Sequence, residues 1–346
     1  MAAYVVRRLL WALVLLVAVT IVSFVLFFVI PTGPVKLYVR TGTGMTDINQ
    51  ATGVRGPIYT EYARFLWGLA HASLGRSFRG REDVAATVAA AAPVTASLVL
   101  GGALVWMLIA VPLGVLTALR PRSALDRGAT ILVLLGVSVH PVWISLVLLY
   151  LFGFKLHLFP LGGYCDLVNP PPGAGCAGPV QWAYHLFLPW LTFAVLFAAL
   201  YVRMIRASVL ETLGEEYVCT ARAKGAPEWR VLRSHVLRNA LLPVVTMLGM
   251  DIGVAFGGAL FIETVFDLQG LGRTAYRAVS THDLPLLLGV LIVTTTAIVI
   301  LNLIVDVAYS LLDPRVRLAA RPDEAERPRR SRARTPTGSP AATAST

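Results

Sequence analysis

The side chains that could act as nucleophiles, bases or metal ligands are scattered along this chain. The motifs His-Glu-x-x-His, which binds zinc in proteases, and Gly-x-Ser-x-Gly, which carries a hydrolase nucleophile, do not occur. The six histidines lie far apart: His71, His140, His157, His185, His235 and His282. Because an enzyme needs such groups to converge at one place, the sequence predicts no catalytic residue and no metal or cofactor bound by this chain.

The three cysteines divide into a pair and a single residue. Cys165 and Cys176 fall in one loop rich in proline and glycine, whereas Cys219 stands among basic residues. If the loop is extracellular, a disulfide between Cys165 and Cys176 is favoured, and two unpaired thiols are the alternative. A metal site is disfavoured because Asp166 is the only nearby side chain of a ligand type.

A carboxylate and three glycines share one long apolar stretch. Gly249, Gly253 and Gly257 are spaced by four residues, which lets two helices approach closely. Asp251 lies two residues from Gly249 and from Gly253, roughly 160–200° around a helix, and therefore points away from the glycines. A charge in hydrocarbon is costly and is a candidate for function. We interpret Asp251 as lining a pathway or as bonding to a third helix, and the sequence leaves both open.

Three further polar residues interrupt apolar stretches. Asn302 and Asp306 share one helix face with Thr295, and hydrogen bonding between helices is favoured there over lining a pathway. His140 precedes Pro141, where a helix is expected to kink. A buried histidine with its hydrogen bonds satisfied is favoured at this position over a proton relay.

The composition requires lipid around these residues. Hydrophobic residues make up 56% of the chain and charged residues 14%, whereas a soluble domain carries about a quarter charged residues. Mean hydropathy is +0.71. Stretches long enough to span a bilayer, about 20 residues, are predicted at residues 9–30, 94–119, 128–154, 186–202, 240–262 and 284–311. The predicted fold class is an all-α integral membrane protein with six transmembrane helices.

The net charge of +11 is distributed as expected for a membrane protein. Arginine and lysine gather between the second and third spans, in residues 203–239 and in the C-terminal tail, whereas residues 155–185 hold one lysine and no arginine. Since positive charge marks cytoplasmic loops, we expect both termini in the cytoplasm. No pattern of basic and aromatic residues suggests nucleic acid.

This topology divides the chain into four parts. Residues 1–30 form a cytoplasmic stub and the first span, and residues 31–93 form an external segment with an amphipathic helix at 59–69. Residues 94–312 form the membrane core, including the cytoplasmic loop 203–239. The tail 313–346 has almost nothing to bury and is expected to be mostly disordered and basic.

The cytoplasmic loop is long enough for two helices. Glu215 opens a run of helix formers that ends with Arg222 and Lys224, a charge order that matches the helix dipole. Gly225 suits the residue after a helix, and Pro227 suits the first turn of the next one. In that second helix, a shared face is predicted for residues at spacings of three and four, Trp229, Leu232 and Val236, with Arg230 and Arg233 on another face.

Such a helix–turn–helix presents small residues and cations to the cytoplasm, where a groove on a partner could receive them. A simple positively charged anchor is the alternative. The stretch resembles the coupling loop of ABC importer permeases, in the form found in the dipeptide/oligopeptide/nickel family. The matching residues are Tyr217-Val218, Ala221-Arg222-Ala223-Lys224-Gly225, His235 and Leu237-Arg238-Asn239-Ala240-Leu241-Leu242-Pro243. Cys219-Thr220-Ala221 replaces the general Glu-Ala-Ala, a departure typical of the peptide subgroup.

The resemblance extends to about Arg317 and includes a second region after the fifth span. The matching residues there are Glu263-Thr264-Val265-Phe266 and Gly270-Leu271-Gly272. By resemblance, Glu263, Phe266, Gly270 and Gly272 belong to an external loop that contacts a binding protein or closes over the pathway. An ordinary surface loop is the alternative.

The resemblance implies a type I importer permease in the cell membrane that carries di- or oligopeptides. Nickel complexes, glutathione or another small solute are alternatives, and a stand-alone carrier is disfavoured because no internal repeat is visible. The implied partners are a second related permease, two ATPase subunits and an external substrate-binding protein. ATP and Mg would be used by the ATPases, since no phosphate-binding loop occurs here. The residues implied to dock into an ATPase are Glu215, Tyr217, Ala221, Arg222, Ala223, Lys224 and Gly225.

Overall fold

The computed structural model describes residues 2–25, 58–71, 73–77, 80–124, 126–128, 131, 136, 139–167, 176 and 178–312. Regular structure in these residues is helical, apart from an isolated bridge between Arg76 and Asp83. The α-helices are α1 (Ala2–Phe24), α4 (Ile58–Ala70), α5 (Val84–Leu119), α7 (Pro141–Leu148), α8 (Pro179–Leu213), α9 (Glu216–Ala223), α10 (Glu228–Arg230), α11 (Leu237–Ala240), α12 (Leu242–Val265), α13 (Leu271–Thr281) and α14 (Leu284–Leu312). The π-helices are η2 (Leu149–Lys155) and η3 (Val231–Val236).

Five of these helices are long and apolar enough to cross a membrane: α1, α5, α8, α12 and α14. The predicted span at 128–154 corresponds in part to α7 and η2, which together form a shorter apolar helix, Pro141–Lys155. Much of its first half lies outside the described residues. The helical membrane fold is therefore confirmed, and the count of six spans stays a prediction.

Two spans are longer than predicted. Helix α5 begins at Val84 rather than at residue 94 and continues through Pro93 and Pro112, because neighbouring helices compensate for lost backbone hydrogen bonds in membrane helices. Asp83 caps its first turn by accepting a hydrogen bond from Ala85 N–H at 3.0 Å. Helix α8 runs from Pro179 to Leu213, well into the segment predicted as a loop. Apolar length thus locates a span without fixing where its helix ends.

The core lies where α5 packs against α8. Trp106 of α5 is fully buried and stacks on Phe197 of α8 with ring centroids 4.6 Å apart. Gly102 faces Phe193, so that a Cβ there would lie 2.9 Å from the ring. Trp190 Nε1–H donates to the Ser97 carbonyl at 3.0 Å. These contacts hold the two longest helices together, whereas most side chains of α1 stay exposed, as expected of a helix facing lipid.

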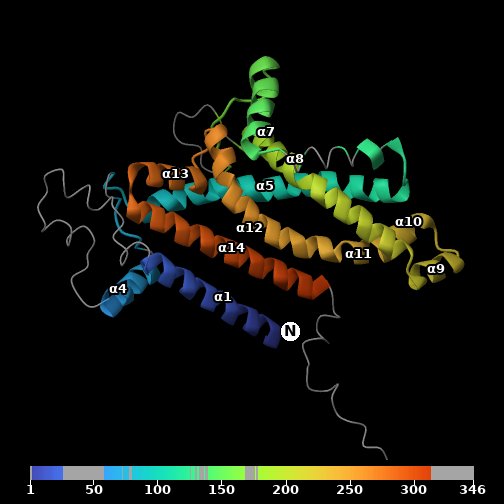
Figure 1. Cartoon of the computed structure of the whole chain (residues 1–346), viewed down its shortest axis with the longest axis horizontal. Helices are drawn as coiled ribbons and strands as arrows, with labels where there is room; N and C mark the ends of the chain where they lie inside the picture. Colours follow the sequence, from blue (N-terminus) through green and yellow to red (C-terminus); the bar gives the residue numbers. More distant parts are fainter. Residues whose placement is uncertain are drawn as a thin grey trace, which may run out of the picture.

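The bundle has two distinct ends (Figure 1). Helices α4 and α13 lie at one end, and α9 and α10 lie at the other. Helix α4, which matches the amphipathic helix predicted at 59–69, contacts the end of α1 through Tyr62. The Tyr62 hydroxyl lies 3.0 Å from Thr20 Oγ1, and its ring packs edge-on against Phe24.

Candidate functional site

Helix α9 ends as the sequence predicts. Glu215 is its N-cap residue, and Lys224 is its C-cap residue. Gly225 follows with φ +78°, a left-handed conformation that favours glycine. Its N–H donates to the Arg222 carbonyl at 2.9 Å, and Ala226 N–H donates to the Ala221 carbonyl at 3.2 Å. The chain therefore turns back sharply after α9 and starts α10.

A charged pair closes this turn. Arg222 Nε lies 2.9 Å from Glu228 Oε1, and Arg222 Nη2 donates to Glu228 Oε2 at 3.3 Å. Both side chains are largely exposed, at 40% for Arg222 and 74% for Glu228, so the pair adds little to stability. The pair joins the last turn of α9 to the first residue of α10 across the turn that contains Gly225.

The predicted face of the second helix is wrong in one residue. Trp229 is 68% exposed, whereas Val231 and Val236 are fully buried. Trp229 lies in α10, and from Val231 the chain continues as the π-helix η3, whose i to i+5 hydrogen bonds bring Val231 and Val236 toward one face. A spacing of three and four in the sequence does not reveal this change of helical period.

Hydrogen bonds to the short helix α11, which precedes α12, connect α9 indirectly to the spans. Asn239 Nδ2 donates to the Tyr217 hydroxyl at 2.7 Å, next to the start of α12. Ser208 Oγ of α8 donates to the Ala240 carbonyl at 2.8 Å. Val218 of α9 is fully buried. Displacing α9 would therefore act on both α8 and α12.

A second link joins the turn after α5 to α8. Arg206 Nε lies 2.8 Å from Asp126 Oδ1, and its Nη2 donates to Oδ2 at 3.0 Å. Asp126 also accepts from the backbone N–H of Arg122 at 3.0 Å. This ion pair is largely shielded from solvent at Asp126, whose side chain is 12% exposed, and it holds the ends of α5 and α8 together near α9.

Asp251 reaches a third helix, one of the two alternatives that the sequence left open. The Tyr201 hydroxyl of α8 donates to Asp251 Oδ2 at 2.7 Å. The glycines face α14 instead: a Cβ at Gly249 would lie 2.7 Å from Val305, and one at Gly253 would lie 3.2 Å from Ile298. The predicted packing of the glycine stripe is thus confirmed for these two residues.

The third glycine of the stripe, Gly257, borders a pocket and not a neighbouring helix. Nothing lies within 4 Å of a Cβ built at Gly257, which lines a pocket of about 250 Å³ between α5, α12, α13 and α14. Its lining is mostly apolar, with hydroxyls from Thr95, Thr294 and Thr295. Asn302 lies further along α14 and is half-buried, and the side chain of Asp306 lies outside the described residues.

The expected external loop at Glu263 is in fact a buried junction. Glu263 belongs to the last turn of α12 and is fully buried, and Phe266 is 1% exposed. Thr95 Oγ1 of α5 donates to Glu263 Oε1 at 2.5 Å, and Arg273 N–H of α13 donates to Oε2 at 2.9 Å. Gly270 leaves room for this carboxyl, since a Cβ there would overlap it. Each carboxyl oxygen of Glu263 thus accepts a hydrogen bond, as buried polar groups generally require.

Glycines and backbone groups complete the junction. Leu271 N–H, at the start of α13, donates to Thr95 Oγ1 at 2.7 Å. Gly272 packs against the backbone of Leu260, and Gly163 N–H donates to the Phe266 carbonyl at 3.1 Å. The exposed surface at this end belongs instead to the outer face of α13, where Tyr276 and Val279 are each 56% exposed.

His140 is exposed, so the buried position expected for it is wrong. It is the N-cap residue of α7, where Val142 N–H donates to its Nδ1 at 3.3 Å. Its ring packs edge-on against Phe261 of α12 with centroids 5.3 Å apart. Proline at the first helical position and a side-chain acceptor before it explain this helix start.

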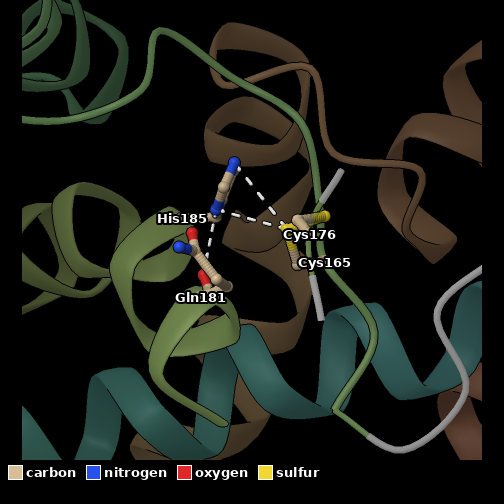
Figure 2. Close-up of a disulfide and its surroundings, with 4 residues drawn as sticks. All are labelled: Cys165, Cys176, Gln181 and His185. Carbon is tan, nitrogen blue, oxygen red and sulfur yellow. Dashed lines mark hydrogen bonds between the residues drawn. A yellow bond between two sulfur atoms is a disulfide. The ribbon is translucent and has the colours of Figure 1, made fainter. Parts of the chain in front are cut away.

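Cys165 and Cys176 are joined by a disulfide in the structure, with Cα atoms 5.8 Å apart. Figure 2 shows His185 of α8 facing this disulfide. Cys165 is 1% exposed, whereas Cys176 is half-buried. Cys219 is a free and exposed cysteine on α9. Within the described residues, no cluster of three or more metal-ligand side chains occurs.

Comparison with known proteins assigns this arrangement to a family. Residues 110–318 match the model of the binding-protein-dependent transport system inner membrane component, and residues 1–99 match the model of the N-terminal part of such membrane components. The chain belongs to this family. It is therefore a membrane-embedded permease subunit of an ABC importer.

Relatives of this inner membrane component match it over nearly their whole length. A putative peptide permease protein of Brucella suis is 36% identical over 92% of this chain and 100% of its own. The probable D,D-dipeptide transport system permease protein DdpB of Escherichia coli is 34% identical over 90% and 96%. The oligopeptide transport system permease protein AppB of Bacillus subtilis is 33% identical over 91% and 99%.

Proposed function

We propose that the chain translocates di- or oligopeptides across the cell membrane. The observation that carries this proposal is its similarity, over nine-tenths of its length, to permeases named for peptides, D,D-dipeptides and oligopeptides. The chain provides the path, and separate ATPase subunits that bind ATP and Mg provide the free energy. A second related permease and an external substrate-binding protein complete the assembly.

Both termini are cytoplasmic in this proposal, with α9 on the same side. The arrangement in Figure 1 supports it, because the start of α1 and the end of α14 point toward the end of the bundle that carries α9. The disulfide lies near the other end, since Gly163, two residues before Cys165, contacts Phe266. Disulfides persist in oxidising compartments outside the cytoplasm. In this proposal the chain crosses the membrane six times, with the third span at residues 128–154. An even number of spans places both termini on the same side of the membrane.

Helix α9 is the part that contacts an ATPase subunit. Its small residues and the turn at Gly225 form a short projection at the end of the bundle (Figure 1). Tyr217 connects this projection to Asn239 of α11, and α11 bonds α8 through Ser208 and directly precedes α12. When the ATPases close, movement of α9 would shift both spans and switch the path from inward-open to outward-open. The outer face of α13 is the proposed contact for the binding protein.

A reconstituted complex tests the proposal. We expect ATP-dependent uptake of short peptides into proteoliposomes when the binding protein is supplied, and competition by unlabelled peptides but not by nickel complexes. Variant Gly225→Val should insert into the membrane normally, and its complex should hydrolyse ATP without the corresponding peptide uptake. Uptake by the isolated chain without ATPases, or normal coupling in Gly225→Val, would contradict the proposal.

A further inference from the structure

The disulfide has chemically different surroundings at its two sulfurs. Cys165 Sγ lies 3.4 Å from His185 Nδ1 and 3.8 Å from His185 Nε2 (Figure 2). Cys165 is 1% exposed, so a reagent from solution does not reach its sulfur. Cys176 is half-buried and is therefore the more exposed of the two cysteines. A thiol that attacks this disulfide from solution therefore meets Cys176 first.

The orientation of His185 is set by its own helix. Its Nδ1 lies 2.9 Å from the Gln181 carbonyl, one turn earlier in α8. A carbonyl oxygen only accepts hydrogen bonds, so Nδ1 carries a proton that it donates to Gln181. Nε2 is then the ring nitrogen left without a backbone partner in this contact, and it lies 3.8 Å from Cys165 Sγ. The histidine thus faces the sulfur that would leave.

We propose that this disulfide is a site of thiol–disulfide exchange, in which a small or protein thiol of the external compartment attacks Cys176 and Cys165 leaves toward His185. The thiolate forms a new S–S bond with Cys176 Sγ, and the bond between Cys176 and Cys165 breaks. The electron pair of that bond stays on Cys165 Sγ. The proton that the attacking thiol gave up on forming its thiolate is taken up by His185 Nε2, and the protonated ring then pairs with the Cys165 thiolate or returns this proton to it. The attacking thiol is oxidised to the mixed disulfide while Cys165 is reduced. Stabilising the leaving thiolate speeds such exchange.

The segment before Cys165 is held by contacts that exchange does not break. The Tyr184 hydroxyl donates to the Leu158 carbonyl at 2.8 Å, and Phe159 stacks on Phe187 with centroids 4.8 Å apart. Gly163 N–H bonds to the Phe266 carbonyl. Exchange therefore releases Cys176 while Cys165 remains beside His185, ready to re-form the disulfide by attacking the mixed disulfide.

Reduced glutathione is a suitable probe for the purified, assembled complex. After a short reaction, free thiols are alkylated and peptides are mapped by mass spectrometry, with the exposed thiol of Cys219 as the internal standard for alkylation. We expect the glutathione adduct on Cys176 and the alkyl group on Cys165. An adduct mainly on Cys165, or the absence of a disulfide before reduction, would overturn the proposal.

Variants of His185 test whether this histidine speeds the exchange. His185→Phe and His185→Gln should slow exchange about tenfold, the effect expected from losing a hydrogen bond to a charged group. His71→Phe is the matched control, because His71 Nδ1 makes the same one-turn contact with the Trp67 carbonyl at 2.9 Å, at a position far in sequence from the disulfide. Unchanged melting of the complex confirms that the variants fold. Equal exchange rates in His185→Phe, His185→Gln and wild type would overturn the proposal.

Discussion

The two ends of the bundle hold their short helices in different ways. At the α9 end, the side-chain hydrogen bonds and ion pair made by α9 itself join exposed groups, such as Arg222 with Glu228. At the α13 end, Glu263 and Thr95 are 0% and 1% exposed and bond to each other. Removing a partner from a buried hydrogen bond costs far more than breaking an exposed pair. The α9 end can thus change its contacts at low free-energy cost, whereas the α13 end is built to keep them.

The largest expected effect is at the buried junction. Glu263→Ala removes the acceptor of Thr95 Oγ1–H and Arg273 N–H, and should lower the free energy of unfolding by about 3 kcal/mol. Denaturant unfolding of the purified chain in detergent measures it. The control is Glu211→Ala at an exposed position of α8, where a change below about 0.5 kcal/mol is expected. Equal losses in both variants would contradict the comparison.

Backbone strain at the α9 end should have a smaller effect. Gly225→Ala places a side chain at φ +78° and should cost about 1–2 kcal/mol, although nothing lies within 4 Å of the new Cβ. The cost comes from the turn alone, so uptake per ATP hydrolysed should fall along with stability. Gly214→Ala, at φ −83°, is the matched control and should change neither quantity. If Gly214→Ala also lowered uptake per ATP hydrolysed, the effect of Gly225→Ala could not be assigned to the turn at Gly225.

The link from α9 to the start of α12 should contribute less again. Tyr217→Phe removes the acceptor of Asn239 Nδ2–H and should cost about 0.5–1.5 kcal/mol. A double-mutant cycle with Asn239→Ala isolates this pair, because the coupling free energy reports their contact alone. A coupling energy of zero would mean that the bond contributes nothing to holding α9.

The smallest effect is expected for the exposed ion pair. Arg222→Ala should change the free energy of unfolding by less than about 1 kcal/mol, and the difference should shrink as salt is added. Unfolding at low and high ionic strength measures both quantities. A loss as large as that of Glu263→Ala would show that the α9 end is held as firmly as the α13 end.

Local signals predicted one end of the molecule better than the other. The turn at Gly225 follows from neighbouring residues, so the sequence located it correctly. The shared face predicted for Trp229, Leu232 and Val236 was wrong because the chain changes from α10 to the π-helix η3 at Val231, and a spacing of three and four does not reveal this change. Glu263 was expected in an external loop because its role as acceptor for Thr95, 168 positions away along the chain, cannot be inferred from neighbouring residues. Amphipathic periodicity in residues 271–281 was a usable signal for the helix that this junction positions.

Helix α5 connects the two ends directly. Thr95 joins it to the buried junction, and the turn after Leu119 joins α8 through Asp126. The 24 residue steps from Thr95 to Leu119, at 1.5 Å each, span about 36 Å. If the Thr95 end is fixed, a tilt of about 5° swings the other end through about 3 Å, by the geometry of a rigid rod of that length. Such a tilt would therefore displace the α9 end most and the buried Thr95 junction least.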